Sequence, residues 1–144
     1  IHIYNPDRGI INIFATTIHE LAHASHWRMD KWHYNNGSNK LVESWATGVQ
    51  YAITHSVWNQ YEGRYDDMPT DYTNVVLDMI DSFTDPDNAG REDPAEDSVE
   101  GYTIKQLEDA LEGQTTFNGY RDNIKNLYNN ATENKLDALF GYWD

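Results

Sequence analysis

Cysteine is absent from this chain of 144 residues. Its absence excludes disulfides, thiolate zinc fingers, iron–sulfur clusters and cysteine nucleophiles. Any metal ion bound by the chain must therefore be held by histidine and carboxylate side chains. The sequence offers 6 His and 24 Asp+Glu for that purpose.

Basic residues are scarce, since 10 Lys+Arg stand against 24 Asp+Glu and give a formal net charge of −14. No cluster of Lys and Arg is available to neutralise phosphates, so we expect no nucleic-acid partner. The same charge disfavours binding to an anionic membrane surface. No apolar run approaches the roughly 18 residues that a membrane span requires.

Aromatic residues are plentiful, with 5 Trp, 10 Tyr and 4 Phe. They can bury enough area to offset the entropy of ordering, and the length suits one domain with a single core. The first residue is Ile1, and no signal peptide is visible. We therefore expect residues 1–144 to form a single domain of a longer or processed chain, and we expect a secreted, periplasmic or cell-surface bacterial protein.

Apolar periodicity predicts a mainly α-helical fold, α+β at most, with a minimal strand at residues 1–4. The predicted helices cover residues 10–29, 38–61, 71–83, 103–112, 116–128 and 132–143. Ser38, Asp71 and Thr132 are their candidate N-caps. The acidic tract 84–101 is predicted to be a loop. Asp85, Asp87, Gly90 and Glu96 match some positions of a calcium loop, but Ala89 and two prolines make a turn-rich loop the better interpretation.

Residues at helical spacing define the faces that we expect to be buried. The stripe of the first helix consists of Ile11, Phe14, Ile18, Leu21, Ala22 and Ser25. That of the second consists of Val42, Trp45, Ala46, Val49, Ile53 and Val57. The sequence favours core and interface packing, and not a platform for stacking sugars, as the role of Trp27, Trp32, Trp45 and Trp58.

The first predicted helix carries the run His19-Glu20-Leu21-Ala22-His23. Two histidines four residues apart leave the same helix face about 6 Å apart along the axis, which suits one Zn²⁺ ion. Glu20 follows the first histidine and is able to reach a water molecule on that ion and take its proton. At this chain's own frequencies the pattern is expected about 0.015 times by chance, so it is a signal and not a proof.

The run resembles the H-E-x-x-H motif of the zincin metallopeptidases. The metzincin branch extends it with a glycine and a third histidine, but this chain has His26 and Met29 at those positions. In the gluzincin branch, a glutamate on the next long helix is the third ligand, roughly twenty residues after the second histidine. Glu43 follows His23 by twenty residues and lies on the second predicted helix. The resemblance covers about residues 10–60.

The resemblance implies a catalytic zinc site, with one Zn²⁺ per chain held by His19, His23 and Glu43. It implies that Glu20 is the general base and that a peptide or protein is the substrate. It also implies a residue that stabilises the oxyanion, for which Tyr102 is the nearest analogue by position. Tyr51 and His55, on the helix of Glu43, are weaker candidates. Thr47 stands where thermolysin-like enzymes have an aspartate, so the surroundings of the ligands differ or another residue takes that place.

The sequence thus predicts a gluzincin-type zinc metallopeptidase that hydrolyses peptide bonds with activated water. The alternative is a catalytically inactive zincin-like module that binds zinc or serves a structural role. A third alternative is a helical protein without metal, in which the histidines are ordinary surface or core residues and Glu43 is a solvated charge. We interpret His26 and His33 as solvated or hydrogen-bonded residues and not as ligands. The oligomeric state is left open.

Overall fold

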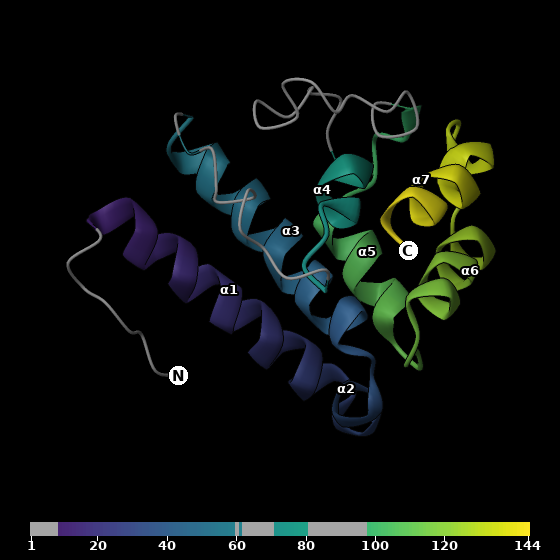
Figure 1. The fold of residues 1–144 in the computed structure, drawn as a ribbon, viewed down its shortest axis with the longest axis horizontal. Helices are drawn as coiled ribbons and strands as arrows, with labels where there is room; N and C mark the ends of the chain where they lie inside the picture. The colour runs from purple at the N-terminus through teal and green to yellow at the C-terminus, as the bar shows by residue number, and fades with distance from the viewer. Residues whose placement is uncertain (1–8, 60, 62–70, 81–97) are drawn as a thin grey trace.

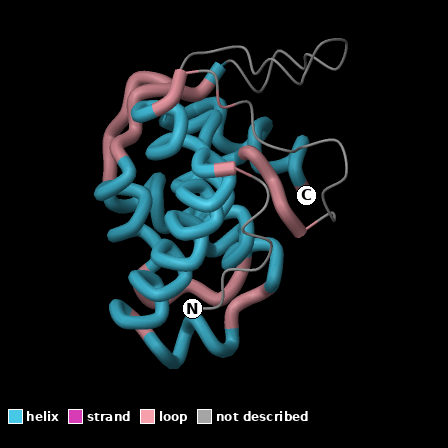
Figure 2. The backbone as a smooth tube through the Cα atoms, turned by 90° about the vertical axis from the view of Figure 1, so that its left-hand side faces the viewer, coloured by secondary structure: helices cyan, strands magenta, loops and turns pink. Residues whose placement is uncertain are grey.

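The computed structural model describes residues 9–59, 61, 71–80 and 98–144. All regular structure in these ranges is helical, which confirms the mainly α prediction (Figure 2). The predicted strand at 1–4 and the calcium-like tract from Asp85 to Glu96 lie outside the described residues. Within the described ranges, the structure contains no helix both long and apolar enough to cross a bilayer.

Two long helices, α1 (Ile10–Met29) and α3 (Asn39–Val57), run antiparallel, with the short α2 (Lys31–Asn36) at the turn between them (Figure 1). The predicted bounds of α1 are confirmed. Ser38 caps α3 as predicted, because its hydroxyl accepts a hydrogen bond from the Leu41 N–H at 3.3 Å. α3 ends four residues earlier than predicted, since Trp58 has an extended backbone. α2 was not predicted; the Asp30 side chain caps it.

Small residues bring α1 and α3 together. Ala15 and Ala22 are buried, and the Trp45 indole N–H donates to the Ala22 carbonyl at 3.3 Å. The predicted stripe of α1 is wrong at Leu21, which is 48% exposed. Successive helical residues are turned by about 100°, so Leu21 cannot share the face of Ala22. The buried face continues instead through His26.

The predicted packing roles of the tryptophans are confirmed only in part. Trp45 is buried in the main core, and Trp58 packs edge-on against Phe14 with ring centroids 4.8 Å apart. Trp27 and Trp32 are 44% and 64% exposed, so they do not belong to the core, and their role in an interface stays a prediction. Trp27 lies in the last turn of α1 and Trp32 lies in α2, which has no buried residue.

The short helix α4 (Val75–Ile80) packs against the middle of α3 (Figure 1). Gly48 makes this approach close, because a Cβ atom there would lie 2.5 Å from the Val76 Cβ. The helix begins at Val75 and not at Asp71, so the predicted cap is wrong. The Thr73 hydroxyl instead accepts a hydrogen bond from the Val75 N–H at 3.4 Å. Residues 81–83 of the predicted helix lie outside the described residues.

The C-terminal part contains α5 (Ile104–Leu111), α6 (Phe117–Leu127), the 3-10 turn η4 (Glu133–Lys135) and α7 (Leu136–Trp143). Thr103 and Thr116 cap α5 and α6. The predicted capping role of Thr132 is wrong, because its hydroxyl bonds Asn130 and the Glu100 carbonyl. These helices share one core with the α1–α3 hairpin, and its largest buried side chains include Trp45, Tyr120, Phe140, Leu41, Leu107 and Ile124.

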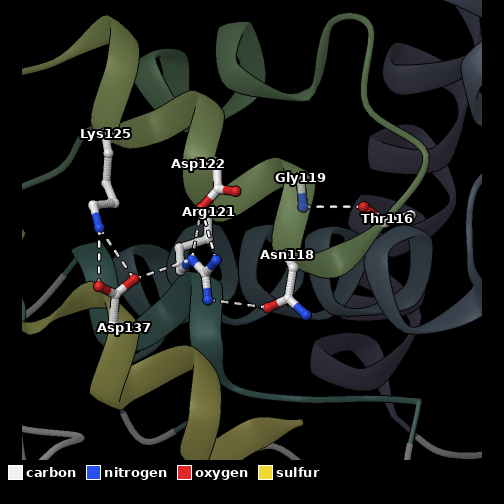
Figure 3. Close-up of polar contacts among 7 residues, drawn as sticks. All are labelled: Thr116, Asn118, Gly119, Arg121, Asp122, Lys125 and Asp137. Atoms are coloured by element: carbon white, nitrogen blue, oxygen red, sulfur yellow. Dashed lines mark hydrogen bonds and ion pairs between the residues drawn. The ribbon is translucent and has the colours of Figure 1, made fainter.

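Two polar connections hold the C-terminal helices in place. The Gly113 N–H, in a backbone conformation with a positive φ of 77° that suits glycine, donates to the Asp30 carboxylate at 3.2 Å. Between α6 and α7, Asp137 accepts from Lys125 and forms an ion pair with Arg121 (Figure 3). Asp137 is largely exposed, so this surface pairing contributes no more than about 1 kcal/mol per pair.

Candidate metal centre

His19, His23 and Glu43 meet at the interface of α1 and α3, one turn into α3 and well inside α1. The antiparallel hairpin explains the meeting, because residues late in α1 face residues early in α3. The two histidine side chains are 15% exposed and the Glu43 side chain is 25% exposed. The three side chains are therefore sheltered but remain in reach of solvent.

The donor atoms of these residues form a nearly equilateral triangle. The Nε2 atoms of His19 and His23 lie 3.0 Å apart, and each lies 3.3 Å from Glu43 Oε2. In a tetrahedral zinc site with bonds of about 2.0–2.1 Å, adjacent ligand atoms are separated by about 3.3–3.4 Å. The observed spacing therefore fits a small tetrahedral cation, and the three residues form a group that could hold a metal ion.

Glu43 is held as a carboxylate at this site. Its burial alone would raise the pKa, but hydrogen bonds from His19 and His23, together with their charge when protonated, outweigh burial and lower the pKa to about 2. A ligand carboxylate must be deprotonated to bind a metal. Glu43 meets this condition at neutral pH.

Glu20, the predicted base, lies next to His19 on α1 and is partly exposed. The negative charge of Glu20 contributes to raising the pKa of Tyr34 and of Tyr72. In both tyrosines burial is the largest cause, followed by the charge of Glu43. The charges of both glutamates thus act on the same two phenols.

Sequence reasoning missed Tyr34 and Tyr72. The Tyr34 ring lies edge-on to His23 with centroids 6.2 Å apart, and the Tyr72 ring stacks on His19 at 6.3 Å and 18°. Tyr34 lies on α2, a helix that the sequence did not predict, and Tyr72 lies just before α4. No motif in the sequence marks either residue.

The predicted oxyanion candidates lie in other surroundings. Tyr102 is buried in the main core, where burial and the charge of Glu133 raise its pKa to about 12. Its hydroxyl has no hydrogen-bond partner among the described residues. Tyr51 and His55 stack on one another, and His55 Nδ1 lies 3.2 Å from the Tyr61 carbonyl oxygen. The role of Tyr102 stays a prediction, and no recorded contact joins it to the three donors.

His26, one turn after His23, is fully buried. Neither ring nitrogen has a hydrogen-bond partner among the described residues, so the prediction of a solvated or hydrogen-bonded histidine is wrong. Its ring lies edge-on to Tyr34 with centroids 5.1 Å apart. Burial and the nearby His23 lower its pKa to about 4, against a smaller opposing effect of Asp30.

Buried His26 should make the metal-free protein less stable in mild acid. The unfolded chain binds this proton near pH 6.5 and the folded chain only near pH 4, so the unfolded state holds more protons between these values. The stability that neutral His26 contributes is fully present above pH 6.5 and is lost as the pH falls toward 4. From pH 7 to 4.5 we expect a loss of about 2–3 kcal/mol in the free energy of unfolding.

Urea unfolding of the parent and of His26→Phe at both pH values measures this contribution. Phenylalanine keeps the ring against Tyr34 and removes two buried polar atoms without partners, so the variant should be at least as stable at pH 7. Between pH 7 and 4.5, the free energy of unfolding of the variant should fall by about 2–3 kcal/mol less than that of the parent. Equal pH dependence in the two proteins would contradict the assignment.

The Nδ1 atoms of His19 and His23 are buried and have no hydrogen-bond partner among the described residues. In many metal sites this second nitrogen donates to a carboxylate or carbonyl, which orients the ring. Here the two imidazoles instead contact aromatic rings, with Tyr72 stacked on His19 and Tyr34 edge-on to His23. Comparison of the chain with protein-family models, curated proteins and solved structures found no match.

Proposed function

We propose that this chain is a zinc-dependent metallopeptidase of gluzincin type, with one Zn²⁺ bound by His19, His23 and Glu43. The observation that carries the proposal is the triangle of two imidazole nitrogens and one carboxylate oxygen, with separations of 3.0, 3.3 and 3.3 Å. Two nitrogen donors and one oxygen donor are a ligand set that zinc accepts. Three protein ligands leave a fourth position for water or substrate, as in catalytic sites.

Bound zinc lowers the pKa of water toward 7 and polarises a substrate carbonyl. Glu20 supplies the general base of the proposed reaction, because it follows His19 on α1 and is partly exposed. Its carboxylate takes the proton of the attacking water and passes it to the leaving amine. A peptide or protein substrate and a secreted, periplasmic or cell-surface location in a bacterium belong to the same proposal.

Metal analysis and a peptide-library assay of the purified chain test the proposal together. We expect one zinc per chain, hydrolysis of peptide bonds, loss of hydrolysis on chelation and its return when zinc is added back. A protein that binds zinc and cleaves no peptide under any of these conditions would favour the inactive zincin-like module. A protein that takes up no zinc would overturn both assignments.

A further inference from the structure

Five rings form a continuous row through the donor triangle. Tyr72 lies stacked on His19, with ring centroids 6.3 Å apart and 18° between the ring planes. The His19 and His23 rings meet edge-on at 4.6 Å and 84°. Tyr34 lies edge-on to His23 at 6.2 Å and to His26 at 5.1 Å. These separations lie in the range of about 4.5–7 Å in which aromatic rings pack together, so each ligand imidazole contacts one phenol ring and the other ligand.

Ser44, the neighbour of Glu43 on α3, holds the end of the row at Tyr72. The Ser44 hydroxyl donates to the Asp71 carbonyl at 3.3 Å. It accepts from the Thr73 N–H at 3.2 Å and from the Thr73 hydroxyl at 2.8 Å. These two partners flank Tyr72 in the chain. Because Ser44 and Thr73 are buried, the bonds are shielded from water and fix the backbone on both sides of Tyr72.

The other end of the row is held by the turn that carries α2. The Asp30 carboxylate caps α2, because it accepts from the His33 N–H at 3.1 Å, and it also accepts from the Gly113 N–H at 3.2 Å. Tyr34 follows on α2, and its backbone N–H donates to the Asp30 carbonyl at 3.0 Å. His26, the last ring of the row, is fully buried. The backbone at both tyrosines is therefore held by contacts outside the donor triangle.

The imidazole ligands need a second group to fix their rotation. The torsion that turns a histidine ring is broad and roughly two-fold, and a half turn would carry Nε2 away from the triangle. A hydrogen bond at Nδ1 fixes the ring in many metal sites, but the Nδ1 atoms of His19 and His23 have no such partner among the described residues. A phenol ring packed against the imidazole opposes the same rotation, because a close-packed interior leaves no room for the imidazole to turn.

We propose that Tyr72 and Tyr34 are positioning residues whose rings, and not their hydroxyls, orient His19 and His23 for metal binding. The inference rests on the proposed metal centre but not on peptidase activity. It gives aromatic packing the role that hydrogen bonds at Nδ1 have in many other metal sites. The metal affinity of the site then depends on the presence of a ring at both positions.

Competition with a chromophoric chelator measures the dissociation constant for zinc in variants that remove either the hydroxyl or the whole ring. Tyr72→Leu and Tyr34→Leu remove the ring and should each weaken zinc binding about 10–100-fold, the usual effect of losing an outer contact. Tyr72→Phe and Tyr34→Phe keep the ring and should bind zinc within about threefold of the parent value. Trp32→Leu is the matched control, because Trp32 lies edge-on to His33, a histidine outside the triangle, at 4.7 Å. Its zinc affinity should equal that of the parent.

Two further measurements separate positioning from a general loss of structure. The visible spectrum of the Co²⁺-loaded protein depends on ligand geometry, and it should change in the two leucine variants and in neither phenylalanine variant. Both tyrosines are only partly buried, so the leucine variants should stay folded, with the circular dichroism of the parent in the metal-free state. Ser44→Ala keeps every ring of the row but frees the backbone beside Tyr72, so it should weaken zinc binding as well.

Parental zinc affinity in both leucine variants would overturn this inference alone. Phenylalanine variants that bind zinc as weakly as the leucine variants would also overturn it, because the hydroxyls and not the rings would then set the affinity. Absence of zinc binding in the parent would overturn the metal centre itself.

Discussion

Glu20→Gln should keep zinc bound and reduce peptide hydrolysis by about 10²–10⁴-fold, the usual contribution of a general base. Glutamine has the shape of glutamate but cannot accept the proton of the attacking water at neutral pH. Glu20 is not part of the donor triangle, so the dissociation constant for zinc should stay within about threefold of the parent value. Steady-state kinetics on a cleaved peptide and metal analysis of the same preparations give the two numbers.

Glu112→Gln is the matched control for that variant. It removes one negative charge from an exposed residue at the end of α5, away from the donor triangle. Its hydrolysis rate should equal that of the parent, which would show that a change of net charge alone has no effect. If Glu20→Gln cleaved peptide as fast as the parent, the proposed role of Glu20 would be excluded while the metal centre would stand.

His23→Ala should weaken zinc binding on the order of 10³-fold, beyond the 10–100-fold typical of outer contacts. The variant removes one corner of the triangle and leaves His19 and Glu43 as the remaining donors. Titration with a competing chelator gives the dissociation constant. Hydrolysis at limiting zinc should be lost in parallel, because the metal supplies the activation of water.

His33→Gln is the control for histidine removal. His33 pairs with Asp30 at 2.6 Å on α2 and belongs to no donor triangle, so its zinc affinity should match that of the parent. A loss of affinity as large as that of His23→Ala would show that changes at any histidine disturb the fold. Retention of full affinity in His23→Ala would exclude His23 as a ligand.

The sequence alone was sufficient to predict the part of the metal centre that lies on one helix. The spacing of His19 and His23 follows from helix geometry, and the bounds of α1 follow from its apolar periodicity. Glu43 was placed near them through the resemblance to gluzincins, and the structure brings it there because α3 turns back antiparallel to α1. The meeting of the three donors is therefore a consequence of local structure plus one antiparallel turn.

The sequence could not predict those features of the site that depend on contacts between residues far apart in the chain. Tyr72 comes to the site because the Ser44 hydroxyl and the absence of a side chain at Gly48 let residues 71–80 lie on α3. No periodicity marks such a contact. The burial of His26 is a second example, since a polar residue on the inner face of α1 was expected to find water or a partner. Trp27 was assigned to core or interface packing by residue type alone, and its exposure excludes the core.

The close approach at Gly48 makes the fold sensitive to substitution at a residue that supplies no donor atom. A single methyl group at that position would meet Val76 and act as a wedge between α3 and α4. The wedge would lift Tyr72 and Thr73 with the helix they precede, although no ligand had been altered. Displacements of about 1 Å are enough to impair a catalytic arrangement. The working geometry therefore depends on one hydrogen atom where every other amino acid would place carbon.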